Sequence, residues 1–196
     1  GKVVALFSGQ GSQYLEMGRE LVINFPCLRQ TYGDIDQLFY KDDLQPVSEI
    51  VFPPPVFDTA QRQAQVAALQ RTEYAQPAIG AFSVGLYKIL QQGGFKPDFV
   101  LGHSFGELTA LWAAGVLSEE DYFFLVKARG QAMAAPNDPE FDAGAMLAVK
   151  GDISQVGEVI KNFPLVTIAN LNSPRQVVLA GAKAEIAQVQ EQLKAK

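Results

Sequence analysis

Histidine and cysteine are nearly missing from this sequence: its 196 residues include one of each, His103 and Cys27. A single cysteine excludes a disulfide within the chain and is typical of proteins from a reducing compartment, so we expect a cytoplasmic protein. Cys27 follows Pro26 among residues with a helical pattern, which favours a role in packing rather than in chemistry.

Clusters of basic residues and long apolar runs are missing as well. The net charge of −5, without any concentration of Lys and Arg, argues against a nucleic-acid partner. No apolar run approaches the length of a membrane span, and the first residues lack the pattern of a signal peptide. A content of 48% hydrophobic and 19% charged residues is typical of a globular protein that can bury a substantial core.

The stretch Gly102-His103-Ser104-Phe105-Gly106-Glu107 is the strongest chemical motif in the chain. An apolar run of strand length precedes it and a helix-like apolar segment follows, so the pattern predicts a strand, a sharp turn and a helix. A G-x-S-x-G pattern in that setting is a nucleophile elbow, in which the serine hydroxyl projects from a strained turn. The two glycines are needed because strand and helix backbones pass too closely there for a Cβ.

The remaining elements of the first two thirds follow from apolar periodicity. The apolar run 3–7 predicts a buried parallel strand, and it leads into the glycine-containing loop 8–13. Helices are expected around 17–22, over 28–39 and from Gln76 until Gly93-Gly94 stops the last of them. Residues 41–72 contain Pro46 and three consecutive prolines, which predicts an irregular excursion with at most a short helix at 61–69.

A further helix is expected from Ser118 to about residue 135, because Ser118 and the acids after it form a capping box. On this helix Leu125, Arg129 and Met133 recur every four residues and share one face. A guanidinium in an apolar row is unusual, because its burial without a partner costs free energy. The pattern alone leaves two interpretations open: Arg129 reaches solvent or a local acid, or it serves a site.

Asn137-Asp138-Pro139 marks a boundary, after which the pattern changes. Strands are expected at 145–149, 166–169 and 177–180, and helices at 153–163 and 184–193. This β-α-β-β-α order is one strand short of the ferredoxin-like unit. The sequence therefore predicts an α/β protein with two parts, residues 1–136 and residues 137–196.

Five separated motifs in one order resemble the malonyl-CoA:acyl carrier protein transacylase family. They are Phe7-Ser8-Gly9-Gln10-Gly11-Ser12-Gln13, Gln76-Pro77-Ala78, the Ser104 motif, Ala113-Ala114-Gly115-Val116-Leu117-Ser118 and Arg129-Gly130-Gln131-Ala132-Met133. The chain is most similar to acyltransferase domains of multidomain polyketide, polyunsaturated fatty acid and glycolipid synthases. The resemblance implies an α/β-hydrolase-like core carrying an inserted ferredoxin-like subdomain, both incomplete at the C-terminus of this chain.

The resemblance also implies a role for each of five residues. Ser104 is the nucleophile that carries the acyl group, and backbone N–H groups of Gln10 and Phe105 hold the oxyanion. Arg129 binds the free carboxylate of a malonyl unit through a bidentate pair. His103 shapes the site beside the nucleophile, and Phe105 narrows the pocket for the acyl chain.

The partners implied by the resemblance are substrates rather than bound cofactors. Malonyl-CoA is the acyl donor, and the phosphopantetheine thiol of an acyl carrier protein is the acceptor. Neighbouring synthase domains are expected as further partners. No bound cofactor, metal ion, nucleic acid or membrane is implied.

One departure from the family pattern concerns the base that activates the serine. The family uses a histidine that follows the small subdomain, whereas the one histidine here directly precedes Ser104, where it projects differently from the turn. We therefore expect the catalytic histidine and the last strand beyond Lys196, a start inside a longer polypeptide, and a fragment that is inactive alone. Two alternatives stay open: a serine esterase- or lipase-like hydrolase, and a non-catalytic scaffold.

Overall fold

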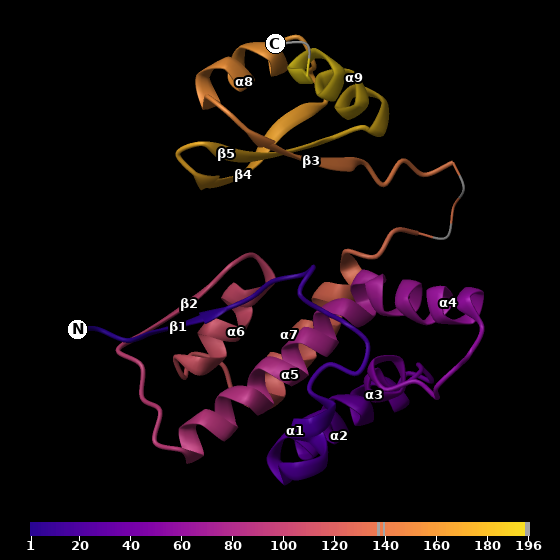
Figure 1. The fold of residues 1–196 in the computed structure, drawn as a ribbon, viewed down its shortest axis with the longest axis vertical. Helices are drawn as coiled ribbons and strands as arrows, with labels where there is room; N and C mark the ends of the chain where they lie inside the picture. Colours follow the sequence, from indigo (N-terminus) through magenta and orange to yellow (C-terminus); the bar gives the residue numbers. More distant parts are fainter. Residues whose placement is uncertain (137, 139, 195–196) are drawn as a thin grey trace. The chain divides into compact units, whose positions relative to one another are not determined.

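The computed structural model describes residues 1–136, 138 and 140–194. The chain divides into two compact units, Gly1–Ala134 and Ala135–Lys196 (Figure 1). Each unit has its own cluster of buried apolar side chains. Of the predicted boundary motif, Asn137 and Pro139 lie outside the described residues, as do the last two residues of the chain. In the described part of the chain, no helix has both the length and the apolar content that crossing a membrane requires.

The first unit combines two strands with seven helices among its described residues. They are β1 (Val4–Phe7), α1 (Arg19–Asn24), α2 (Pro26–Tyr40), α3 (Val47–Val51), α4 (Thr59–Gln70), α5 (Thr72–Gln92), β2 (Phe99–Gly102), α6 (Phe105–Ala113) and α7 (Glu119–Ala132). β1 and β2 pair in parallel, as the sequence predicts, and their register sets Phe7 beside Gly102. The carboxyl ends of both strands therefore lie side by side, which is where loop 8–13 and the Ser104 turn begin.

Helix starts follow from side chains that satisfy the first N–H groups. Ser118 accepts a hydrogen bond from the N–H of Asp121 at 3.1 Å, and three acids occupy the first turn of α7, which confirms the predicted start. Asp58 caps α4 in the same way through the N–H of Gln61 at 2.9 Å. Pro26 is the first residue of α2. Proline has no backbone N–H, and this costs nothing here because the first N–H groups of a helix have no partner within the helix.

The prediction of an irregular segment at 41–72 is wrong in part. The segment contains α3 and a full α4 of 12 residues, and α5 begins at Thr72 rather than at Gln76. The carboxylate of Asp36, on α2, accepts a hydrogen bond from the N–H of Ser48 at 3.0 Å and so caps α3 from another helix. Local sequence does not reveal a cap of this kind. Pro77 lies inside α5, where it removes one backbone donor without ending the helix.

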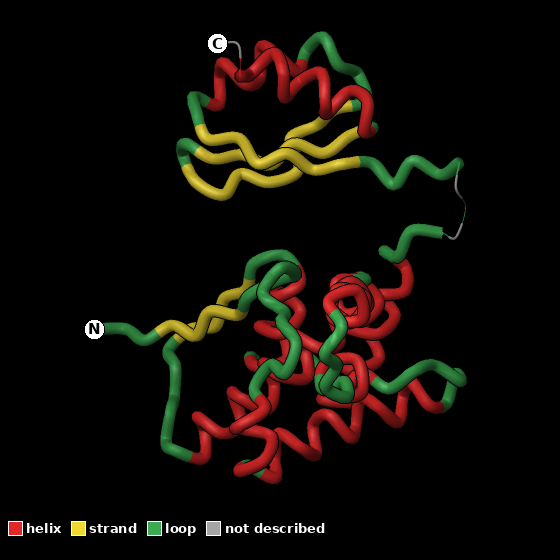
Figure 2. The backbone as a smooth tube through the Cα atoms, turned by 45° about the vertical axis from the view of Figure 1, so that its right-hand side comes forward, coloured by secondary structure: helices red, strands yellow, loops and turns green. Residues whose placement is uncertain are grey.

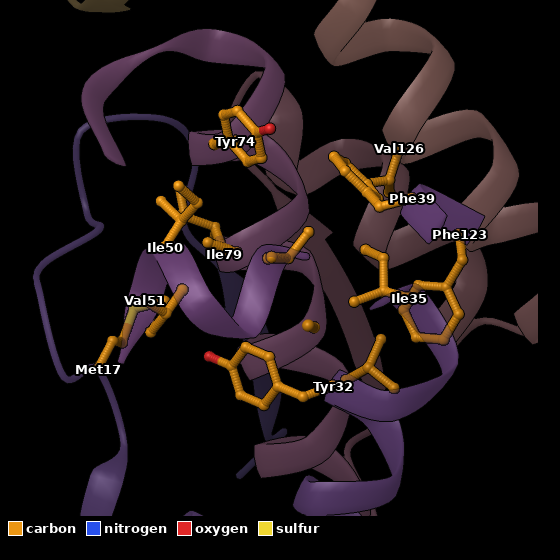
Figure 3. Packing of buried hydrophobic residues seen from close by; sticks show 14 of the residues in the cluster. Met17, Tyr32, Ile35, Phe39, Ile50, Val51, Tyr74, Ile79, Phe123 and Val126 are labelled. Carbon is orange, nitrogen blue, oxygen red and sulfur yellow. The ribbon is translucent and has the colours of Figure 1, made fainter. Parts of the chain in front are cut away.

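The core of the first unit is made by helices. Buried side chains of α2, α3, α5 and α7 form one cluster, and Figure 3 shows Ile35 and Phe39 near Phe123 and Val126. A smaller cluster joins Phe7, Tyr87 and Ala110 at the sheet. On the other face of the sheet Leu6 is 72% exposed and Leu101 is 56% exposed. The prediction of a buried β1 is therefore wrong for one of its two faces among the described residues.

The second unit is an antiparallel sheet with two helices on one face (Figure 2). Its elements are β3 (Ala145–Lys150), α8 (Ile153–Ile160), β4 (Val166–Ser173), β5 (Gln176–Gly181) and α9 (Lys183–Lys194), in the predicted β-α-β-β-α order. The strand order in the sheet is β3-β5-β4. β4 continues through Asn172 and Ser173, where the sequence predicts a turn, so the hairpin turn falls at Pro174 and Arg175. The helices cover Val177 and Leu179 of β5.

Candidate functional site

Ser104 lies at the turn between the end of β2 and the start of α6, as the sequence predicts. Its φ of 54° and ψ of −113° are the dihedral angles of the first central residue of a type II′ turn, a position that glycine usually occupies. The residue is exposed. A serine is thus held in a strained backbone conformation with its side chain accessible to solvent, an arrangement found at functional sites.

Gly102 and Gly106 allow the strand and the helix to pass closely. A Cβ on Gly102 would overlap the carbonyl group of Gly106, and a Cβ on Gly106 would overlap the backbone of Phe7. Both positions are packed against backbone, which cannot move aside as a flexible side chain can. The steric reason given for these two glycines is therefore confirmed.

The glycine-containing loop after β1 lies directly against this turn. The N–H of His103 donates to the carbonyl of Phe7 at 3.1 Å, and a Cβ on Gly9 would lie 2.5 Å from the carbonyl oxygen of His103 and 3.5 Å from the Cβ of Ser104. Within the loop, the hydroxyl of Ser12 donates to the carbonyl of Gly9 at 2.9 Å. The structure thus brings Gln10, the next residue of the loop, beside the Ser104 turn.

The start of α6 adds backbone donors to the same place. Phe105 is the first residue of this helix and is fully buried, so its side chain anchors the helix while its N–H has no partner within the helix. The positive end of the helix dipole also falls at this turn. His103 is exposed and directly precedes Ser104, and its backbone is fixed by the bond to Phe7.

Arg129 extends from α7 and is partly buried. Its Nη1 donates to the Oε1 of Gln76, on α5, at 2.6 Å, and its guanidinium carbon lies 6.0 Å from the centre of the Phe105 ring. Within the described residues its hydrogen-bond partner is thus a distant amide rather than a local acid. The apolar row around it is not buried, since Met133 is 55% exposed and Leu125 is 37% exposed. The structure therefore brings Arg129 beside the first residue of α6.

Gln76 belongs to one of the five motifs that carry the family resemblance, but sequence reasoning gave it no role in the site. It is fully buried, and its Nε2 donates to the Oγ1 of Thr72 at 2.8 Å and to the Oε1 of Gln10 at 3.4 Å. Thr72 in turn donates to the Oε1 of Gln10 at 2.9 Å. The signal was available, because Gln76 is a polar residue three positions before Ile79, on the apolar face of its helix.

The five predicted site residues thus lie in one unit, around the carboxyl ends of β1 and β2. Loop 8–13 supplies Gln10, the turn supplies His103 and Ser104, α6 supplies Phe105, and α7 supplies Arg129 through its contact with α5. An exposed hydroxyl, backbone donors at a helix start and a guanidinium are three of the groups that acyl transfer with a charged acyl chain uses, and a general base is the fourth. Among the described residues, no group of three or more His, Cys, Asp or Glu side chains could hold a metal ion.

Over nearly its whole length the chain is similar to an acyl transferase family model and to parts of large synthases. The family model described as an acyl transferase domain matches residues 4–196. The chain is 35% identical over 187 residues to a polyunsaturated fatty acid synthase polypeptide of Thraustochytrium sp., covering 93% of this chain and 6% of that protein. It is 37% identical over 195 residues to mycoketide-CoA synthase of Mycobacterium tuberculosis, covering 100% of this chain and 4% of that protein.

Solved structures agree with these relatives. The acyltransferase domain from the second module of the salinomycin polyketide synthase has a TM-score of 0.80 and 35% identity, with 100% of this chain and 42% of that chain covered. MCAT from Streptococcus pneumoniae has a TM-score of 0.78 and 36% identity, with 99% and 59% covered. The chain thus spans less than two thirds of these solved chains and a small part of the curated synthases. By its sequence over residues 4–196 and by its mixed α/β fold, the chain belongs to the acyl transferase domain family.

Proposed function

We propose that this chain carries the nucleophile of an acyltransferase that moves a malonyl group from coenzyme A to the phosphopantetheine thiol of an acyl carrier protein. The observation that carries the proposal is the exposed Ser104, at a φ of 54° on the turn between β2 and α6. One solved structure supports the choice of acceptor, because it is described as a type II polyketide synthase acyl carrier protein in complex with its malonyl-transacylase. Its matching chain has a TM-score of 0.82 and 31% identity, with 100% of this chain and 60% of that chain covered.

The first half-reaction forms an ester on the serine. A general base takes the Ser104 proton, Oγ bonds to the thioester carbonyl carbon, and the carbonyl oxygen becomes an oxyanion. The N–H groups of Gln10 and Phe105 donate to that oxyanion, which the close approach of loop 8–13 and the start of α6 supports. The carbon–sulfur bond then breaks, the thiolate of coenzyme A takes up the proton, and malonyl-Ser104 remains.

The second half-reaction repeats these steps with a different nucleophile. The phosphopantetheine sulfur bonds to the ester carbonyl carbon, the same two N–H groups hold the oxyanion, and the bond to Oγ breaks. The proton lost by the thiol returns to Ser104. No water enters, so a malonyl thioester is consumed and a malonyl thioester is produced.

Arg129 provides the preference for a malonyl group. A guanidinium has five N–H donors, and one hydrogen bond to Gln76 leaves enough of them for a bidentate pair with the free carboxylate of the acyl chain. The alternative of a hydrolase gives this arginine no role. His103 shapes the site as the residue before the nucleophile. The ring of Phe105 is fully buried in the helix cluster beneath Arg129, so the prediction that it narrows the space for the acyl chain is not supported by its position.

The finer features of the fold belong to the same proposal. We assign residues 1–136 to an α/β-hydrolase-like core with a nucleophile elbow and residues 137–196 to a ferredoxin-like subdomain. The parallel pairing of β1 and β2 and the β3-β5-β4 sheet under two helices support these assignments. Coenzyme A thioester and carrier protein act as substrates, neighbouring synthase domains are further partners, and a cytoplasmic location fits a chain with one cysteine.

The test uses the full polypeptide that carries this chain. Incubation with malonyl-CoA should give a malonyl adduct by intact-protein mass spectrometry, and added phosphopantetheinylated carrier protein should remove it and gain the same mass. Ser104→Ala should abolish the adduct, whereas Ser154→Ala, at an exposed serine of α8, should keep it. An adduct on the Ser104→Ala protein would contradict the proposal.

Arg129→Ala tests the substrate assignment separately. It should lower the preference for malonyl-CoA over acetyl-CoA, measured as the ratio of kcat/KM values, by about tenfold or more, because a hydrogen bond to a charged group contributes about 1.5–3 kcal/mol. Equal loss with both substrates would show that Arg129 has a structural role instead.

A further inference from the structure

We propose that Gln76 is a positioning residue for malonyl recognition, which orients Arg129 and joins it to the loop that contributes the oxyanion donor Gln10. The inference rests on the proposed function. Its basis is one buried amide that contacts both sides of the site: Oε1 accepts from Arg129 at 2.6 Å, and Nε2 faces Thr72 and Gln10.

The orientation of this amide follows from its neighbours. A guanidinium can only donate, so the Gln76 oxygen must face Arg129. The nitrogen then faces three acceptors, which are the Oγ1 of Thr72 at 2.8 Å, the Oε1 of Gln10 at 3.4 Å and the Sδ of Met133 at 3.5 Å. Because Gln76 is fully buried, a flipped amide would lose these bonds without any replacement from water. The direction of the Arg129 contact is thus determined by the protein.

A neutral partner suits an arginine that must bind a carboxylate. An acidic side chain at position 76 would form an ion pair with Arg129 and neutralise its charge before the substrate arrived. The Gln76 amide holds one N–H of the guanidinium while leaving the full positive charge for a ligand. The arrangement limits the freedom of a long side chain, which lowers the entropy cost of binding.

The network continues to the loop beside Ser104. Gln76 donates to the Thr72 hydroxyl, which donates to the side chain of Gln10 at 2.9 Å, so the bonds run in one direction from Arg129 to Gln10. Hydrogen bonds arranged head to tail in this way strengthen one another. The group that binds the free carboxylate and the residue that holds the oxyanion are therefore connected by side chains. The connection fixes the distance between Arg129 and the residue that holds the oxyanion, and a fixed short distance favours a short acyl chain with a terminal carboxylate.

A close helix contact holds the network together. A Cβ on Gly130, the neighbour of Arg129, would lie 3.1 Å from the Cα of Glu73 and 3.1 Å from the carbonyl oxygen of Thr72. The backbone of α7 thus packs directly on the first turn of α5, next to the residues that form the network. A side chain at position 130 would push the two helices apart, which places a second constraint on the Arg129 position.

The experiment compares three variants in the full polypeptide by the ratio of kcat/KM for malonyl-CoA to kcat/KM for acetyl-CoA. Gln76→Met keeps the size of the side chain but removes the acceptor, and should lower the ratio about threefold to tenfold. Gln76→Glu should lower it about tenfold or more, because the new carboxylate occupies Arg129. Val84→Ala is the control, since Val84 is fully buried about two turns further along α5, and it should leave the ratio unchanged.

The double variant Gln76→Met with Arg129→Ala shows whether the two residues act together. Gln76 acts through Arg129, so the double variant should have the same ratio as Arg129→Ala alone. A further loss by the full Gln76→Met factor would overturn the inference, as would an equal loss in Val84→Ala. If Arg129→Ala lowers the ratio and Gln76→Met does not, the inference fails while the proposed function stands. If Arg129→Ala itself leaves the ratio unchanged, the substrate assignment of the proposed function fails.

Discussion

The two units place their cores differently with respect to their sheets. In the first unit the large buried cluster lies between helices, and the two-stranded sheet has one face with exposed apolar side chains. In the second unit the core lies between one face of the sheet and two helices. All five residues of the proposed site lie in the first unit, in loop 8–13, the Ser104 turn, α6 and α7. The first unit therefore keeps most of the residues that stabilise it apart from the residues that form the site, and Phe105 alone of the five belongs to both groups.

This separation has a physical reason. Ser104 occupies a conformation that disfavours any side chain. Gly102 and Gly106 contribute no side chain to the core, because the backbones pass too closely there for a Cβ. Such a site contributes little free energy of folding. The helix cluster around Phe39 and Val126 compensates for it from elsewhere in the unit.

The largest expected effect is in the helix cluster. Phe39→Ala should destabilise the first unit by about 3–5 kcal/mol, because it removes a buried ring between α2 and α7 and leaves a cavity. Amide hydrogen exchange of α2 and α5 peptides in the full polypeptide measures the change. Tyr40→Ala is the matched control: the neighbouring side chain is 59% exposed, and its loss should change stability by less than about 0.5 kcal/mol. Similar acceleration in both variants would contradict the position of this core.

The corresponding change in the second unit is Leu179→Ala. Leu179 is fully buried in the central strand of the sheet, and its loss should cost about 2–5 kcal/mol, measured by exchange of β3 and β5 peptides. Leu171→Ala on β4 serves as the control, since that side chain is 68% exposed. If the control gave the larger effect, the core would lie on the other face of the sheet.

The stability of the first unit should depend on pH through a buried acid, Asp36. Burial raises the pKa of Asp36, so the folded first unit holds this proton more tightly than the unfolded chain does, and stability falls as pH rises through the window between the two pKa values. Asp36→Asn keeps an oxygen for the Ser48 N–H without the charge, so it should gain stability relative to the natural chain as pH rises. Asp36→Ala should cost about 1–3 kcal/mol, because the cap is lost. Urea unfolding at several pH values measures both, and a parallel pH dependence of the natural chain and Asp36→Asn would contradict the assignment.

The acid of the second unit should respond with the opposite sign. Asp142 accepts hydrogen bonds from the N–H groups of Gly144 at 2.9 Å and Lys183 at 3.1 Å, which lower its pKa. Its stabilising effect is present above the ordinary pKa of an aspartate and is lost as pH falls through the lower folded value. Asp142→Asn should therefore weaken the second unit slightly at neutral pH and have less effect in acid. Exchange of α9 peptides at two pH values measures this, and a larger loss in acid would refute it.

Much of this architecture can be predicted from the sequence where local pattern decides it. The β-α-β-β-α order of the second unit and the turn at Ser104 follow from apolar periodicity and from glycine spacing. What was missed depends on contacts between distant residues. α3 has its cap from Asp36 on another helix, and the exposed face of β1 depends on how many strands neighbour it. Gln76 lies in a quoted motif, but its contact with Arg129, 53 positions away, cannot be predicted from local pattern.

The backbone at Ser104 has a consequence for anyone who engineers this chain. Its φ of 54° and ψ of −113° are angles that glycine adopts readily and other residues do not. A screen for thermal stability alone would therefore favour glycine at position 104, the substitution that also removes the proposed nucleophile. Stability and chemistry select different residues at this one position, so any stabilised version of the chain must be designed with residue 104 held constant.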